Sequence, residues 1–146
     1  MDRRKILKIE LDGLCSAMED SSAEHNYYLD LETGEILLIS DYMDDEEIKK
    51  LKDKIDENFD RYELLPKAES YEGYEDMNAF IGTVNDEHLA ELLNVAINGK
   101  GAFRRFKDVL ESYPKERERW FHFKDDRLKE RALEWLEDID VSLLEE

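Results

Sequence analysis

Two apolar segments joined by a short polar stretch place the strongest constraint on the fold. Residues 25–31 (HNYYLDL) and 35–40 (EILLIS) are rich in aromatic and branched side chains, which favour extended backbone. Between them, Gly34 can adopt the positive φ angle that a tight turn requires. The pattern predicts a β-hairpin over residues 25–40. A short segment at 61–65, ended by Pro66, predicts a third strand.

The rest of the chain shows mainly helical periodicity. From Tyr71 onward, apolar residues recur at the spacing of one helix face. One helix is expected to begin at Pro114 and another at Asp125, and the residues after Val141 are expected to fray. The sequence therefore predicts an α+β fold, in which a small antiparallel β-hairpin or sheet with helices is followed by a helical bundle.

The length of the chain favours one domain. A chain of 146 residues has the usual size of a single domain, so residues 1–146 are expected to form one. Within it, residues 1–66 form a mixed α/β subregion and residues 67–146 a helical one. The segment Pro66–Gly73 is the candidate joint between them.

Charge is abundant and unevenly distributed along the chain. Charged residues make up 41% of the sequence and the net charge is −18, which argues against direct binding to nucleic acid or to anionic membranes. Residues 1–98 carry a net charge of −16 and residues 132–146 a net charge of −6. Residues 99–131, in contrast, carry +4. One basic stretch thus lies within an acidic chain.

Several features exclude classes of protein. Cys15 is the only cysteine, so the chain can form neither an internal disulfide nor a zinc site built from several thiolates. The three histidines share no metal-ligand spacing, and we expect no metal and no cofactor. No segment has the length of a signal peptide or of a membrane span. A cytoplasmic protein without membrane association is therefore expected.

Four segments of the chain resemble a known family. They are YYLDLETGEIL (27–37), YEGYEDMNAFI (71–81), GKGAFRRFKDVL (99–110) and the spaced WFHF and ALEWLE (120–123 and 132–137). Together they resemble the bacterial uncharacterised protein family 0158 over nearly the whole chain. The resemblance implies a small bacterial cytoplasmic protein. It supplies no activity and no catalytic residue.

Residues 99–107, here called the basic segment, contain the candidate binding site. Four cations and no acid occur there, and two glycines precede a predicted helix whose free N–H groups favour anions. The candidate residues are Gly99, Lys100, Gly101, Arg104, Arg105 and Lys107, with Trp120 and His122 as secondary candidates. A purely structural interpretation is also open, because Arg104 with Asp108 and Lys107 with Glu111 have the spacing of helix ion pairs.

The absence of a recognisable catalytic constellation favours a non-catalytic binding or regulatory protein. It would engage a partner protein or an anionic ligand through the basic segment. One alternative is an enzyme that acts on a phosphorylated or carboxylated small molecule and uses a nearby carboxylate or His122 for proton transfer. A second alternative is a nucleic-acid mimic whose acidic face occupies a basic site on another protein. The sequence leaves the partner and the oligomeric state open.

Overall fold

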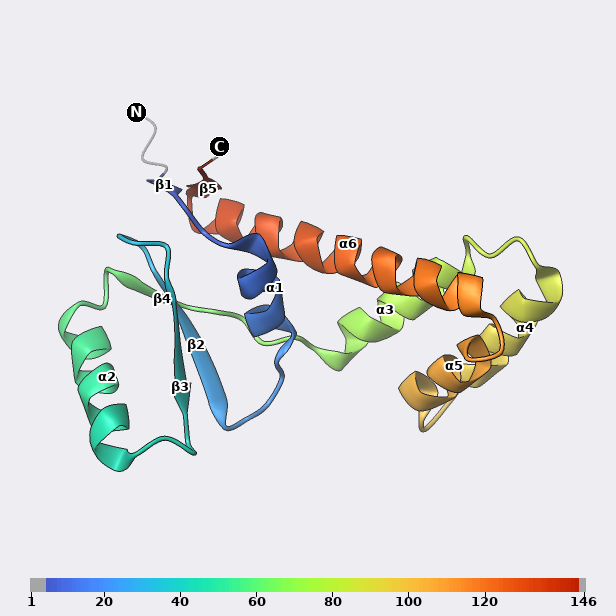
Figure 1. Cartoon of the computed structure of the whole chain (residues 1–146), viewed down its shortest axis with the longest axis horizontal. Coiled ribbons are helices and arrows are strands. Elements are labelled where there is room, and N and C mark those ends of the chain that lie inside the picture. Colours follow the sequence, from blue (N-terminus) through green and yellow to red (C-terminus); the bar gives the residue numbers. More distant parts are fainter. Residues whose placement is uncertain (1–4, 145–146) are drawn as a thin grey trace. The chain divides into compact units, whose positions relative to one another are not determined.

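The computed structural model describes residues 5–144 and shows an α+β protein, as the sequence predicts (Figure 1). In chain order its elements are β1 (Lys5–Leu7), α1 (Leu11–Glu19), β2 (His25–Asp30), β3 (Ile36–Ser40), α2 (Asp45–Glu57), β4 (Tyr62–Leu64), α3 (Ser70–Ile81), α4 (Glu87–Ala96), α5 (Ala102–Leu110), α6 (Pro114–Asp138) and β5 (Val141–Leu143). They gather into two compact units. The sheet unit comprises residues up to Ala68 and from Lys129 onward, and the helical unit comprises Glu69–Leu128. The single domain over residues 1–146 stays a prediction.

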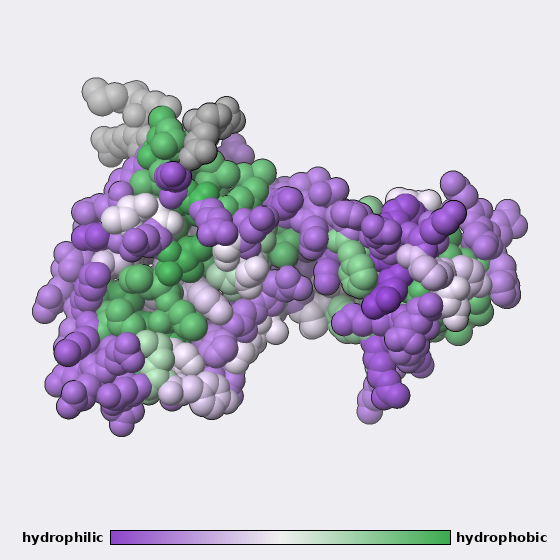
Figure 2. Space-filling model, in the orientation of Figure 1, coloured by the Kyte–Doolittle hydropathy of each residue, from purple (hydrophilic) through white to green (hydrophobic). Residues whose placement is uncertain are grey.

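The predicted hairpin forms the centre of the sheet unit. Strands β2 and β3 pair antiparallel, and β4 pairs with the other edge of β2 to give the order β3-β2-β4. Tyr28 faces Leu37 on one neighbour and Leu64 on the other. On this face of the sheet, α2 contributes the buried Ile55 to a core with Ile39 and Tyr62. In the view of Figure 2, apolar residues gather over the sheet of this unit.

A buried carboxylate ties the hairpin loop to the start of β4. Asp30 is 3% exposed and accepts two hydrogen bonds from the Arg61 guanidinium, at 2.9 and 2.8 Å. It also accepts from the backbone N–H of Glu32 at 2.9 Å, which shapes the loop. The Arg61 guanidinium lowers the pKa of Asp30 well below its usual value, so the pair is ionic in the fold.

The chain is ordered from the end of α6 to Leu144, which corrects the expectation of fraying for residues 142–144; residues 145 and 146 lie outside the described residues. Residues 141–143 form β5, which pairs in parallel with β1, so that Lys5 faces Val141. The Leu144 N–H donates to the Leu7 carbonyl at 2.8 Å, and Val141 is buried. The pairing joins segments from opposite ends of the chain, and local sequence signals do not reveal such a contact.

The helix expected to begin at Pro114 does begin there, but the expectation of a separate helix beginning at Asp125 is wrong. The structure has one helix of 25 residues, α6, and Asp125 lies within it. No proline or glycine interrupts the sequence between Lys115 and Asp138, so the backbone has no residue that strongly opposes continuation.

An aromatic cluster forms the centre of the helical unit. The rings of Phe80 and Trp120 lie 5.3 Å apart and those of Phe106 and Trp120 lie 4.8 Å apart, both in edge-to-face arrangements that aromatic rings favour. Leu89 and Leu93 of α4 are fully buried in the same core. This packing fixes the face of α5 that points inward, and so determines which cations of the basic segment point outward.

Candidate functional site

The basic segment begins at a turn that only glycine allows easily. Helix α4 ends at Ala96, and α5 begins at Ala102. Between them, Gly99 and Gly101 have φ angles of 86° and 76°, in the left-handed region that disfavours other residues. Gly101 is the N-cap of α5 and supplies no side chain to its first N–H groups. The turn thus presents backbone donors at the helix start.

Burial of one face of α5 directs the other face to solvent. Ala102, Phe106 and Leu110 are buried, at the spacing of one helix face. Arg104 and Lys107 lie on the remaining surface, and both are exposed. The basic segment is therefore an amphipathic helix start whose cations lie outside the core.

Arg105 has a structural contact. Its guanidinium donates to the backbone carbonyl of Asn98, in the turn that precedes α5. A side-chain carbon at position 99 would lie 3.7 Å from the Arg105 Nη2 atom, so this guanidinium closely approaches the Gly99 turn. Arg105 thus satisfies a backbone acceptor of the turn, and its donors are only partly available for a ligand.

The other three cations of the segment lack a close carboxylate. Arg104 is 88% exposed, and its Nε lies 3.9 Å from the Asp108 carboxylate. The predicted pair therefore forms, but at the longest distance that still counts as an ion pair. Within residues 5–144, the side chains of Lys100 and Lys107 make no hydrogen bond or ion pair, and the expected side-chain pair of Lys107 with Glu111 does not form. These three charges remain available to a partner.

An apolar side chain lies beside the free cations. Phe103, the residue before Arg104 in α5, is 46% exposed. Its ring packs against Gly73 of α3, where an added side-chain carbon would lie 2.7 Å from Phe103 Cε1. Tyr74, the next residue of α3, is 41% exposed. The surface around the basic segment therefore combines cations with exposed aromatic rings.

The secondary candidates occupy different environments. Trp120 is 5% exposed and belongs to the core of the helical unit, so its ring packs against Phe80 and Phe106. His122 lies two residues later on α6 and is exposed. The neighbouring Trp120 and Phe123 suggest a half-buried, hydrogen-bonded His122, and the structure corrects this by exposing the side chain. Trp120 supports the segment by packing under Phe106, whereas His122 points to solvent.

Other cations of the basic stretch are paired within the protein. Arg119 donates to Glu116 at 2.7 Å and to the Thr83 hydroxyl at 2.7 Å, and this guanidinium lowers the pKa of Glu116. Arg127 donates to the buried Asp76 at 2.8 Å. Arg127 thus joins α6 to α3, and Arg119 joins α6 to the loop after α3, whereas Lys100, Arg104 and Lys107 make no such contact among the described residues.

The sheet unit contains a hydrogen-bonded cluster around His25 that the sequence did not predict. His25 Nδ1 lies 2.6 Å from the Asp20 carboxylate, which also accepts from the Tyr27 hydroxyl at 2.7 Å. The contacts with His25 and then Tyr27 lower the pKa of Asp20 from 3.8 to about 2. A usable signal was present, because His25 and Tyr27 are two residues apart and share one face of a predicted strand.

Two further findings concern residues 5–144. Within them, no three or more histidine, cysteine or acidic side chains come together as a group able to hold a metal ion. Among the helices of the same residues, none has the length and apolar character needed to cross a membrane.

The chain is similar to proteins of one family along almost all its length. It matches the model described as "Uncharacterised protein family (UPF0158)" over residues 4–146. It is 31% identical over 135 residues to a UPF0158 protein of Pseudomonas aeruginosa, covering 92% of this chain and 85% of that relative. It is 32% identical over 140 residues to a UPF0158 protein of Chlamydia trachomatis, covering 88% of this chain and 43% of that relative. The chain therefore spans less than half the length of this chlamydial relative. No solved structure is significantly similar to it.

Proposed function

The chain belongs to the uncharacterised protein family UPF0158, and we propose that it is a non-catalytic binding protein that holds an acidic segment of a partner protein on its basic segment. One observation carries the proposal. In a chain of net charge −18, Lys100, Arg104 and Lys107 keep their charges in solvent with no carboxylate closer than 3.9 Å among the described residues. Cations left unpaired amid so many acids are available for carboxylates from outside.

The surroundings favour a peptide over a small anion. The three cations are spread from the turn before α5 to its second turn, a length of helix that an extended peptide segment can follow. The exposed ring of Phe103 lies among them and offers an apolar contact, which suits an aliphatic side chain next to acidic ones. A segment that alternates acidic and apolar residues matches both features.

Charge reversal at the exposed cations tests the proposal. The probe is a fluorescently labelled peptide of glutamates around a central leucine, and its binding is followed by anisotropy. The double variant Arg104→Glu with Lys107→Glu is expected to bind it at least about tenfold more weakly than the unmodified chain, because rim charges contribute to association through electrostatic attraction. Arg105 is left unchanged because it holds the turn.

A matched control separates this effect from total charge. Lys49→Glu with Lys50→Glu, on the exposed surface of α2, changes the net charge equally and should leave peptide binding within about twofold. Equal loss in both variants would show that only overall charge matters, and the proposal would fail. Displacement of the peptide by millimolar inorganic phosphate would instead indicate a small-anion site, as the enzyme alternative requires.

A further inference from the structure

Strand β3 forms an open edge of the sheet. It lies at one end of the order β3-β2-β4, so only one of its sides is paired. The hydrogen bonds from Asp30 N–H to the Glu35 carbonyl, at 2.8 Å, and from Asp41 N–H to the Glu24 carbonyl, at 3.0 Å, fix the phase of the ladder. Antiparallel pairs alternate between bonded and non-bonded positions. Residues 36, 38 and 40 therefore direct their backbone N–H and C=O groups away from β2.

Two of these three residues keep their outward groups free. Both outward groups of Ser40 are used in the turn that follows the strand. Its N–H donates to the Met43 sulfur at 3.3 Å, and its carbonyl accepts from the Met43 N–H at 3.0 Å. For Ile36 and Leu38, no backbone hydrogen bond on the outward side occurs within residues 5–144. The edge thus offers two donors and two acceptors at the spacing of an extended chain.

The sequence of β3 does nothing to block pairing. Proteins usually protect sheet edges with charged residues, proline or a bulge. The five residues of β3, ILLIS, include no charged residue and no proline, and Leu38 is 37% exposed. The opposite edge is better protected, because β4 has only three residues, includes Glu63 and is followed by Pro66.

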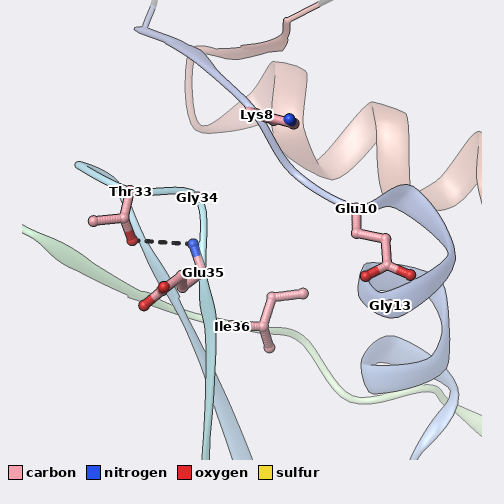
Figure 3. Close-up of a pocket in the computed structure, with 7 residues that line it drawn as sticks. All are labelled: Lys8, Glu10, Gly13, Thr33, Gly34, Glu35 and Ile36. Carbon is pink, nitrogen blue, oxygen red and sulfur yellow. Dashed lines mark hydrogen bonds between the residues drawn. The ribbon is translucent and has the colours of Figure 1, made fainter.

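A hollow lies at the beginning of this edge. It has a volume of about 520 Å³ and is lined on one side by Lys8, Glu10 and Gly13 and on the other by residues 33–36. Figure 3 shows the Ile36 side chain directed toward α1 and the Glu10 carboxylate on the facing side. The side chain of an added strand has room here, beside the Ile36 side chain and the carboxylates of Glu10 and Glu35.

From this geometry we infer that β3 pairs with an extended, positively charged segment of another protein, which adds a strand to the sheet. Main-chain hydrogen bonds to Ile36 and Leu38 hold the segment, and its cations meet the acids that flank the strand, Glu35 and Asp41. The sheet unit carries 26 acidic and 12 basic residues, a net charge of −14. That charge attracts a basic segment and repels a second copy of the same unit.

The inference is independent of the proposed role of the basic segment, which lies in the other unit. Its test uses a short peptide in which valine and threonine alternate and lysine stands at both ends. At saturating peptide, hydrogen exchange of the Ile36 and Leu38 amides, followed by NMR, is expected to slow by at least about tenfold. The amides of Leu37 and Ile39 already bond within the ladder and should change little. Unchanged exchange at Ile36 and Leu38 would overturn the inference.

A pair of variants tests the backbone contact directly. Leu38→Pro removes the outward donor without removing a ladder hydrogen bond, and proline is tolerated at such an edge position. It should weaken peptide binding at least about tenfold, whereas Leu38→Ala, which keeps the N–H, should weaken it less than about threefold. Equal binding by both variants would contradict strand addition. If Leu38→Pro fails to fold, the exchange measurement on the unmodified chain still decides.

The chemistry of the occupant is tested separately. A peptide with glutamate in place of lysine should bind at least about tenfold more weakly, and raising NaCl to about 500 mM should remove most of that difference. Equal binding of the two peptides would overturn the basic partner. A concentration-dependent dimer in sedimentation that Leu38→Pro makes monomeric would identify a second copy as the occupant, and would overturn it as well.

Discussion

Arg104 and Arg105 are neighbours in the sequence, but the fold gives them different roles. Arg104 points away from the core and makes only a 3.9 Å contact with Asp108, whereas Arg105 donates to the Asn98 carbonyl. The basic segment was predicted from its run of cations. The separate role of Arg105 could not be predicted, because it depends on the left-handed turn at Gly99 and Gly101.

At the residue scale, two tyrosine-to-phenylalanine changes should differ in their effect on the free energy of unfolding. The Tyr62 hydroxyl is buried with no hydrogen-bond partner among residues 5–144, so Tyr62→Phe should leave the free energy of unfolding unchanged or raise it by about 1 kcal/mol. The Tyr27 hydroxyl donates to Asp20 at 2.7 Å, and Tyr27→Phe should lower that free energy by about 1 kcal/mol. Urea unfolding measures both. A greater loss for Tyr62→Phe would contradict the assignment.

Asp20 should make the fold sensitive to acid. Its pKa falls from 3.8 to about 2 on folding, chiefly because His25 and Tyr27 hydrogen-bond to the carboxylate. The folded state therefore binds fewer protons than the unfolded state in this range, and the stabilisation is complete above about pH 4 and lost as the pH falls toward about 2.

Comparison of variants isolates this group from the other carboxylates. Over the same pH range, Asp20→Asn should lose less of its free energy of unfolding than the unmodified chain, as measured by urea unfolding at each pH. Asp41→Asn, at an exposed acid, serves as the control and should follow the unmodified chain. Parallel curves for Asp20→Asn and the unmodified chain would refute the role of the cluster.

At the element scale, two glycines of the sheet unit differ in what they permit. Gly34 has a φ angle of 80°, and a side-chain carbon there would lie 2.3 Å from the Lys8 carbonyl oxygen. Gly34→Ala should therefore lower the free energy of unfolding by more than about 2 kcal/mol. Gly13 lies inside α1 with its nearest neighbour at 3.8 Å, and Gly13→Ala should raise it by about 0.5–1 kcal/mol. Thermal and urea unfolding of both variants test this contrast, which equal effects would disprove.

The elements that the sequence predicted well are those defined by local patterns. The hairpin of β2 and β3 follows from strand-forming residues around Gly34, and the inward face of α5 follows from helical spacing. The pairing of β5 with β1 was missed because its partners lie at opposite ends of the chain. The continuity of α6 was missed because the acidic pair at Asp125 and Asp126 resembles a helix start, although no residue there breaks the helix.

At the scale of the whole molecule, the net charge of −18 opposes compaction. Salt should therefore stabilise the fold by screening repulsion among the acids. Raising NaCl from about 10 mM to about 500 mM should raise the midpoint of thermal unfolding, because the screening length falls from about 30 Å to a few ångströms over this range. A fall in the midpoint would mean that internal ion pairs such as Arg61 with Asp30 outweigh the repulsion.

The proposed binding role requires that cations beside the α4–α5 turn accept carboxylates from another chain. Chemical-shift mapping with the glutamate-rich peptide answers this for the unmodified protein. We predict that the shifts concentrate on amides of residues 99–107 and disappear near 500 mM NaCl, as expected of screened contacts between exposed charges at about 4 Å Debye length. Shifts that spread over both units, or none in residues 99–107, would contradict the account.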